Sequence, residues 1–320
     1  MQKIICLVCV FAVFLLVSGC AARPLNEEPP KTSAAQPKAA AAEPASGNTI
    51  QSAANALTVT ISSTEPAATI QPASSSRPGP ALRSAEAVQA IAQAHLRDTP
   101  TEWGMEFDGI VSRFAPQGKQ LALTLDACGG PTGSGVDTAL LDFLTRENIP
   151  ATLFVSGRWA QQHQKLLKEL SENPLFSIQN HGDAHQPLSV TARAAYGIPG
   201  TGGVESAMEE ILAGERAIQE ITGTQTRFFR SGTAHYDDVS VRLLRELGYR
   251  TAGFSVNGDG GATFSAAQVK AALLASRPGD IILCHMNRPD KPTGKGLQEV
   301  LPELIAQGYE FVRLEDVLPG

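Results

Sequence analysis

Gln120-Leu-Ala-Leu-Thr-Leu-Asp126, followed directly by Ala127-Cys-Gly-Gly130, is the stretch of sequence that decides the fold. Its leucines recur at every second position and share one face of a strand, while Thr124 and Asp126 share the opposite face. The two glycines then end the strand in a turn. We therefore predict that Asp126 points from a strand end into a cleft. An aspartate that only caps the turn is the alternative.

Strand and helix patterns alternate from Gln120 to the end of the chain. The predicted strands cover residues 120–126, 151–156, 176–180, 226–230, 250–256, 280–285 and 310–313. The predicted helices cover residues 137–148, 159–172, 204–222, 237–247, 266–276 and 297–307. Such alternation indicates an α/β fold with a parallel sheet, either doubly wound or closed into a barrel, whose chemistry lies at the carboxyl ends of the strands.

Composition limits the class of partner. The 320 residues carry a formal net charge of -6 and 42% hydrophobic residues, and no stripe of lysine and arginine occurs. Binding to nucleic acid depends on clustered positive charge, so we expect no nucleic-acid partner.

The N-terminus has the layout of a secretory signal. A positive charge at Lys3 precedes an apolar run that is too short to span a membrane with confidence, since a span needs about 20 residues. Val17-Ser-Gly-Cys20 resembles the lipobox of bacterial lipoproteins, which implies a signal peptide over residues 1–19 and a lipid on Cys20. We expect an exported protein anchored to the outer membrane and facing the periplasm in a Gram-negative cell, or anchored at the surface of a Gram-positive cell. A cleaved signal or an uncleaved anchor without lipid would export the domain equally well.

A low-complexity segment separates this anchor from the globular part. Residues 20–82 are rich in Ala, Pro and Ser and poor in large apolar side chains, so we predict a disordered tether. A helical preface follows at 83–103, and a single globular domain fills 104–320. The domain keeps only Cys128 and Cys284, which we expect to remain free thiols and not to form a disulfide scaffold.

Further polar side chains fall at or just after predicted strand ends, namely His181, His185, Arg230 and His285. One helical turn would present His181 and His185 on the same side at a spacing suited to one metal ion, although two surface histidines are the plain alternative. Cys284 should point away from His285, to the opposite face of its strand. We assign the remaining histidines of the domain, at positions 95, 163 and 235, to helix surfaces or loops.

Five segments between about Leu121 and Leu318, taken in order, resemble the NodB-type polysaccharide deacetylases, also called carbohydrate esterase family 4. The family motif Thr-Phe-Asp-Asp-Gly corresponds to Thr124-Leu-Asp-Ala-Cys-Gly-Gly130, and His-Ser/Thr-x-x-His corresponds to His181-Gly-Asp-Ala-His185. Phe-Phe-Arg-Pro-Pro appears as Phe228-Phe-Arg-Ser-Gly232, without the prolines that shape one groove wall. Trp-x-x-Asp-x-x-Asp-Trp is reduced to Phe254-Ser-Val-Asn-Gly-Asp259, and Leu-x-His is Leu283-Cys-His285.

The resemblance implies an irregular barrel of about seven strands and metal-assisted attack of water on an acetamide carbonyl. It assigns the catalytic base to Asp126, the general acid to His285 and the metal ligands to His181 and His185. Arg230 would orient the base and favour its ionised form, and Asp259, in preference to Asn257, would favour the imidazolium form of His285.

The chain departs from the family at Ala127, where the family has a metal-binding aspartate. Two imidazoles alone should bind a metal weakly, so we expect an exchangeable zinc ion, with cobalt, manganese or nickel as alternatives. Asp126, Asp183, Cys128 or water would complete the coordination. If the family geometry is retained, Ala127→Asp should add a third ligand.

The expected function is removal of N-acetyl groups from a polysaccharide, with peptidoglycan or another N-acetylglucosamine polymer as substrate. Two alternatives are an O-acetyl xylan esterase and a small-amide hydrolase of the same fold. A third, from another class, is a lipid-anchored carbohydrate-binding protein that has lost catalysis.

Overall fold

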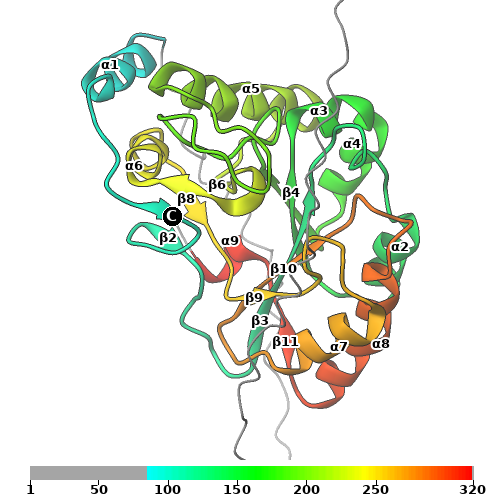
Figure 1. The fold of residues 1–320 in the computed structure, drawn as a ribbon. Coiled ribbons are helices and arrows are strands. Elements are labelled where there is room, and N and C mark those ends of the chain that lie inside the picture. The colour runs from blue at the N-terminus through cyan, green and yellow to red at the C-terminus, as the bar shows by residue number, and fades with distance from the viewer. Residues whose placement is uncertain (1–84, 319–320) are drawn as a thin grey trace, which may run out of the picture. The chain divides into compact units, whose positions relative to one another are not determined.

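The structure is a computed structural model that describes residues 85–318 (Figure 1). The signal peptide, Cys20 and the tether predicted at 20–82 lie outside these residues. Across the described part of the chain, no helix is long and apolar enough to cross a membrane.

A nine-stranded sheet, parallel throughout, forms the centre of the domain. Its order is β2-β8-β6-β5-β4-β3-β10-β9, and β11 pairs with the start of β3. The strands are β2 (Ile110–Val111), β3 (Gln120–Ala127), β4 (Ala151–Val155), β5 (Phe176–Asn180), β6 (Phe228–Phe229), β8 (Arg250–Ala252), β9 (Val256–Asn257), β10 (Ile281–His285) and β11 (Glu310–Phe311). A separate antiparallel pair joins β1 (Trp103–Gly104) to β7 (Tyr236–Asp237).

One continuous segment, residues 250–257, curls this sheet into an irregular barrel. Its first part, β8, pairs with β6, and its last part, β9, pairs with β10, so it connects two distant strands of the order. The segment bends at Gly253, whose amide donates to the carbonyl of Val111. A Cβ at this position would lie 2.6 Å from Ser112 Oγ and 2.7 Å from a methyl carbon of Ile110. Glycine therefore allows the close approach that the bend requires.

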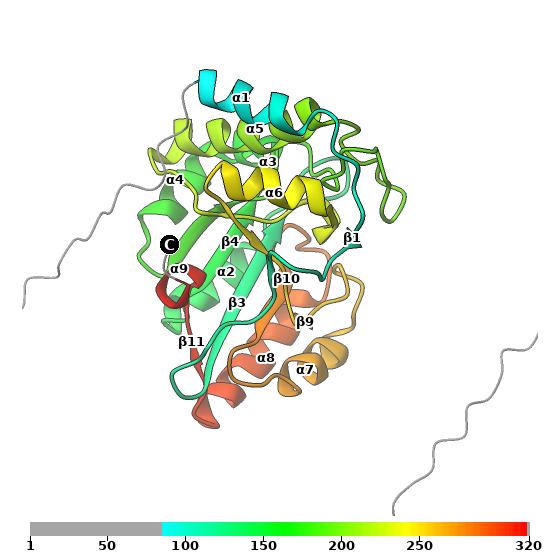
Figure 2. The same cartoon turned by 90° about the vertical axis from the view of Figure 1, so that its left-hand side faces the viewer.

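Helices cover the outside of the sheet. They are α1 (Ala85–His95), α2 (Thr138–Arg146), α3 (Gly157–Gln162), α4 (Gln164–Glu172), α5 (Val204–Thr222), α6 (Asp238–Glu246), α7 (Ala266–Leu274), α8 (Thr293–Ala306) and α9 (Leu314–Val317). Figure 2 shows α1, α5 and α6 lying together and α7 beside α8 in a second group. The fold is thus the α/β barrel of parallel strands that the alternating pattern predicted.

The two faces of β3 bury different kinds of side chain. Its leucines and Ala127 are completely buried in a large apolar cluster that also contains side chains of α2, α3, α4, α7 and α8. Ala122, on the opposite face, belongs to a smaller apolar cluster together with Phe154, Phe228 and Ile281. Thr124 and Asp126 follow Ala122 on this inner face. The alternation read from the sequence thus places Asp126 inside the barrel mouth.

Several element boundaries differ from the predicted ones. The predicted helix at 159–172 is two helices, α3 and α4, that meet at His163, whose Nε2 lies 2.7 Å from the carbonyl oxygen of Ser134. The predicted strand at 226–230 is ordered as a strand only over β6, and α8 begins four residues earlier than expected. Strands β1, β2 and β7, of two residues each, were not predicted.

Candidate active site

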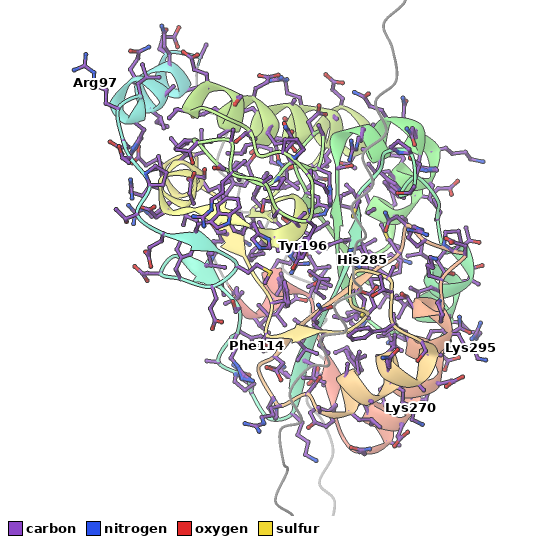
Figure 3. The ribbon with its side chains drawn as sticks, in the orientation of Figure 1. Arg97, Phe114, Tyr196, Lys270, His285 and Lys295 are labelled. Carbon is purple, nitrogen blue, oxygen red and sulfur yellow. The ribbon has the colours of Figure 1, made fainter. Side chains whose placement is uncertain are left out.

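Asp126 and His285 lie side by side because neighbouring parallel strands carry them. In the register of β3 with β10, Asp126 pairs directly with His285. His181 follows the last residue of β5, and Arg230 follows the last residue of β6. Figure 3 marks His285 at the carboxyl end of its strand. Four of the predicted site residues therefore meet at one end of the barrel.

Asp126 is held by a completely buried arginine. Arg230 Nη1 donates to Asp126 Oδ1 at 2.7 Å and to the Thr124 hydroxyl at 2.9 Å, and Nη2 donates to the Gly253 carbonyl at 2.9 Å. Burial alone would raise the pKa of Asp126, but the positive charge of Arg230, with His181 and His285 nearby, lowers it below the ordinary value. The carboxylate is therefore ionised and fixed in orientation.

His285 is oriented by Asp259. The backbone amide of His285 donates to Asp259 Oδ2 at 2.8 Å, and its Nδ1 lies 3.0 Å from Oδ1. Burial alone would lower the pKa of His285, but the Asp259 carboxylate raises it well above the ordinary value. Asn257 is exposed, and its side chain accepts a hydrogen bond from the Gly260 amide. Of the two candidates, Asp259 is thus the one that contacts the histidine.

His181 presents one ring nitrogen to the site. Its Nδ1 lies 2.8 Å from the carbonyl oxygen of Arg230, which can only accept, so Nδ1 carries the proton. The other nitrogen, Nε2, lies 3.7 Å from Asp126 Oδ2 and 3.9 Å from Cys128 Sγ. A nitrogen fixed in this tautomer is suited to bind a metal ion.

His185 reaches the site from a loop and not from a helical turn. The segment from His181 to His185 contains no helix, and His185 has a φ of 60°. The two imidazoles still meet edge to face, with ring centroids 4.8 Å apart. Gly232 packs closely against this loop, because a Cβ at position 232 would lie 2.1 Å from the His185 carbonyl oxygen.

Glu210, which the sequence did not single out, fixes the same loop from α5. Its carboxylate accepts hydrogen bonds from the Ala184 amide, at 3.0 Å and 3.1 Å, and from the Gln186 amide at 3.0 Å. The residue is 5% exposed. These bonds hold the backbone on both sides of His185.

Cys128 lies between the imidazoles. The ligand atoms of Cys128, His181 and His185 lie within 4.8 Å of one another. Burial alone would raise the pKa of the thiol, but the surrounding histidines, His185 first among them, lower it well below the ordinary value. A sulfur and two nitrogens at these separations suit one divalent transition metal.

Ala127 does not face this group. Its side chain is completely buried in the outer apolar cluster, on the face of β3 that carries the leucines. The expectation that Ala127→Asp would supply a metal ligand is therefore not supported, because the new carboxylate would enter that apolar cluster.

The other cysteine and two other histidines have structural surroundings. Cys284 is buried in the outer apolar cluster, on the opposite face from His285, as predicted. Both cysteines of the described residues are free thiols.

His95 is nearly buried between the carboxylates of Asp98 and Glu246, so its assignment to a helix surface was wrong. His235 lies in a loop against the rings of Trp103 and Tyr196.

The part of the chain that carries most of these residues is similar to known proteins. Residues 115–252 match the polysaccharide deacetylase family. This range includes Asp126, His181, His185 and Arg230. The peptidoglycan-N-acetylglucosamine deacetylase PgdA of Listeria monocytogenes is 29% identical over 205 residues, which cover 63% of this chain and 40% of PgdA. The chain thus matches less than half the length of that relative.

Two solved structures share the fold. A carbohydrate esterase family 4 pseudoenzyme from Bacillus anthracis aligns with a TM-score of 0.54 and 20% identity, covering 65% of this chain and 68% of that one. A family 4 acetyl xylan esterase from Clostridium thermocellum, in complex with a cobalt ion, aligns with a TM-score of 0.51 and 27% identity, covering 62% and 90%. The chain thus has the α/β barrel fold of these carbohydrate esterase family 4 structures. Over residues 115–252 the chain is similar to the NodB-type polysaccharide deacetylases, carbohydrate esterase family 4.

Proposed function

We propose that this protein is a metal-dependent hydrolase that removes acetyl groups from the N-acetylated sugars of a polysaccharide. The observation that carries the proposal is the pairing of Asp126 with His285 across adjacent strands. The surroundings of Asp126 favour the ionised carboxylate and those of His285 favour the charged imidazole, and both lie beside side chains that can bind a metal ion. A base and an acid with separate environments are what hydrolysis of an amide requires.

Each residue has a defined part in this reaction. Asp126 accepts a proton from the attacking water, and Arg230 keeps the carboxylate ionised and immobile while it does so. His285 donates a proton to the departing sugar nitrogen, and Asp259 keeps the imidazole charged and correctly turned. When bound, a divalent metal supplies Lewis-acid stabilisation of the negative charge that develops on the carbonyl oxygen.

His181 and His185 would hold the metal. Because Nδ1 of His181 carries the proton, the lone pair of Nε2 is free to coordinate a divalent ion. The cobalt ion in the structure of the Clostridium thermocellum esterase supports a divalent transition metal for this fold. We propose zinc, with cobalt, manganese or nickel as replacements.

Peptidoglycan is the substrate that we propose. The PgdA relative is a peptidoglycan-N-acetylglucosamine deacetylase, and a Bacillus subtilis relative, 22% identical over 233 residues, is a peptidoglycan-N-acetylmuramic acid deacetylase. An exported enzyme anchored through a lipid on Cys20, with residues 20–82 as a tether, would meet this polymer first. Chitin oligomers and acetylated xylan are the competing substrates.

The test measures acetate released from peptidoglycan, chitin oligomers and acetylated xylan by the purified full chain with zinc. Asp126→Asn and His285→Ala should each lower the rate on peptidoglycan at least about 100-fold, because each removes a proton-transfer group. Asp142→Asn, an exposed aspartate on α2, serves as the control for the loss of a carboxylate. Acetate release from xylan alone would show that acetylated xylan, and not peptidoglycan, is the substrate. Equal rates in all variants would refute the catalytic roles proposed for Asp126 and His285.

A further inference from the structure

The alternation of side chains along β3 continues one residue past the strand. Asp126 and Cys128 are two residues apart, and both approach the same atom, His181 Nε2. Ala127, between them, belongs to the opposite face. A metal ligand supplied by this segment can therefore come from position 126 or position 128, and not from position 127.

Cys128 is held in place by its own backbone. Its carbonyl oxygen accepts hydrogen bonds from Ser156 Oγ at 2.9 Å and from Arg158 Nε at 3.2 Å. The chain then turns through Gly129 and Gly130, which have φ of 70° and 81°. These contacts fix the direction of the Cα–Cβ bond, so the sulfur is positioned before any ion binds.

The two carboxylates near the motif, those of Asp126 and Asp183, do not belong to the group of ligand atoms that can share one ion. Asp126 Oδ1 accepts a hydrogen bond from the buried Arg230 guanidinium at 2.7 Å. The Asp183 carboxylate packs against the start of α3, since a Cβ at Gly157 would lie 2.3 Å from Asp183 Oδ1. Among the described residues, the group of ligands that can share one ion consists of Cys128, His181 and His185.

We infer that Cys128 is the third protein ligand of the metal, in a site of two imidazoles and one thiolate. Zinc lies about 2.0 Å from nitrogen and about 2.3 Å from sulfur, so the three side chains need only small movements to share one ion. Three protein ligands leave a further coordination position free for chemistry. Asp126 stays outside the coordination sphere and remains available as the base.

This arrangement changes which metals the protein prefers. Thiolate ligands favour zinc and cobalt, whereas carboxylate ligands suit manganese and magnesium. The inference rests on the metal dependence in the proposed function, but it can be measured without turnover.

The test is a titration of the metal-free full chain with cobalt, followed by absorbance. A bond between cobalt and a thiolate produces a charge-transfer band in the near ultraviolet, which imidazole and carboxylate ligands do not produce. We expect the band in the wild type, and we expect Cys128→Ser to lose it and to bind cobalt at least about tenfold more weakly. Cys284→Ala is the matched control, because this second thiol lies in the outer core, and it should keep the band.

Cys128→Asp separates loss of the sulfur from loss of a folded site. This variant should bind cobalt without the band, and manganese should compete with zinc more effectively than it does in the wild type. Cobalt binding with no band in the wild type, or an equal band in Cys128→Ser, would overturn the inference, as would a wild type that binds no cobalt. Acetate release on the same samples tests the activity separately: a band without acetate release refutes only the proposed function.

Discussion

Asp259 controls His285 through two bonds at once. The Asp259 carboxylate accepts a hydrogen bond from the backbone amide of His285 and also contacts the imidazole ring of that residue. It accepts a further hydrogen bond from the Thr293 hydroxyl at 3.0 Å. Because the ring nitrogen Nδ1 is engaged, the opposite nitrogen is left for the substrate. In the proposed reaction, the orientation and the charge of the acid thus depend on Asp259.

Asp259→Asn should therefore lower kcat at least about tenfold while changing KM little, since it removes the charge that stabilises imidazolium. Asn257→Ala is the matched control, because that side chain is exposed and accepts its hydrogen bond from the Gly260 amide and not from His285. Steady-state kinetics of acetate release would measure both variants. If Asn257→Ala caused the larger loss, the pairing of Asp259 with His285 would not be the relevant one.

Glu210 acts on His185 in a comparable way. Glu210→Ala leaves the amides of Ala184 and Gln186 without their buried acceptor, so the loop that carries His185 should loosen. We expect zinc affinity to fall about tenfold or more. Calorimetric zinc titration should detect this loss. Glu209→Ala, which removes an exposed neighbour on the same helix, should leave the affinity unchanged. Equal affinity in all three proteins would contradict a positioning role.

Some residues of the site could be predicted from their position in the sequence, and others could not. Asp126, His181, Arg230 and His285 could be placed because parallel strands deliver their ends to one edge. Cys128 follows from the same period of two, but only if the alternation is extended past the strand end. Glu210 has no such signal, because it lies in the middle of a helix and reaches the loop only through the tertiary fold.

Among the elements, α1 is attached to the domain by an ion pair. His95, at its end, lies 2.8 Å from Asp98 Oδ2 and 2.9 Å from Glu246 Oε1, the latter on α6. Burial alone would lower the pKa of His95, but these two carboxylates raise it above the ordinary value. The folded protein thus binds this proton more tightly than the unfolded chain does.

The contribution of His95 should depend on pH. It is complete below the unfolded pKa, about 6.5, and is lost as the pH rises through the higher pKa of the folded state. His95→Gln should therefore lower the free energy of unfolding by about 1 kcal/mol or less at about pH 5.5, and by less at about pH 9. Denaturant titrations at both pH values measure this difference. An equal loss at the two pH values would show that the ion pair does not stabilise the fold.

Long elements were easier to predict than short ones. The bounds of β5 and α5 agree with the predicted ranges, because their apolar periodicity extends over whole elements. The single strand predicted at 250–256 bends at Gly253, so that its first part, β8, pairs with β6 and its last part, β9, pairs with β10. Pairs of residues such as β1 and β7 become strands only through their tertiary partners, so no local pattern marks them.

At the scale of the whole molecule, the lipid anchor is a separate prediction. Cys20→Ser should give a protein that takes up no fatty-acid label and leaves the membrane fraction, since the anchor would be lost. The activity of the purified domain should not change. Fractionation and labelling of cells that produce either form measure this. A variant that still takes up label would refute the lipobox, without consequence for the active site.

In the proposed function, a metal held at the barrel mouth lets this chain deacetylate an N-acetylated polymer. The most direct test is acetate release from peptidoglycan by the full chain before and after treatment with a chelator, and again after zinc is returned. We predict release by the metal-loaded protein, loss of at least about 100-fold on chelation, and recovery with zinc. Release that is unaffected by metal removal, or no release from any of the tested polymers by the zinc-loaded chain, would contradict metal-dependent deacetylation.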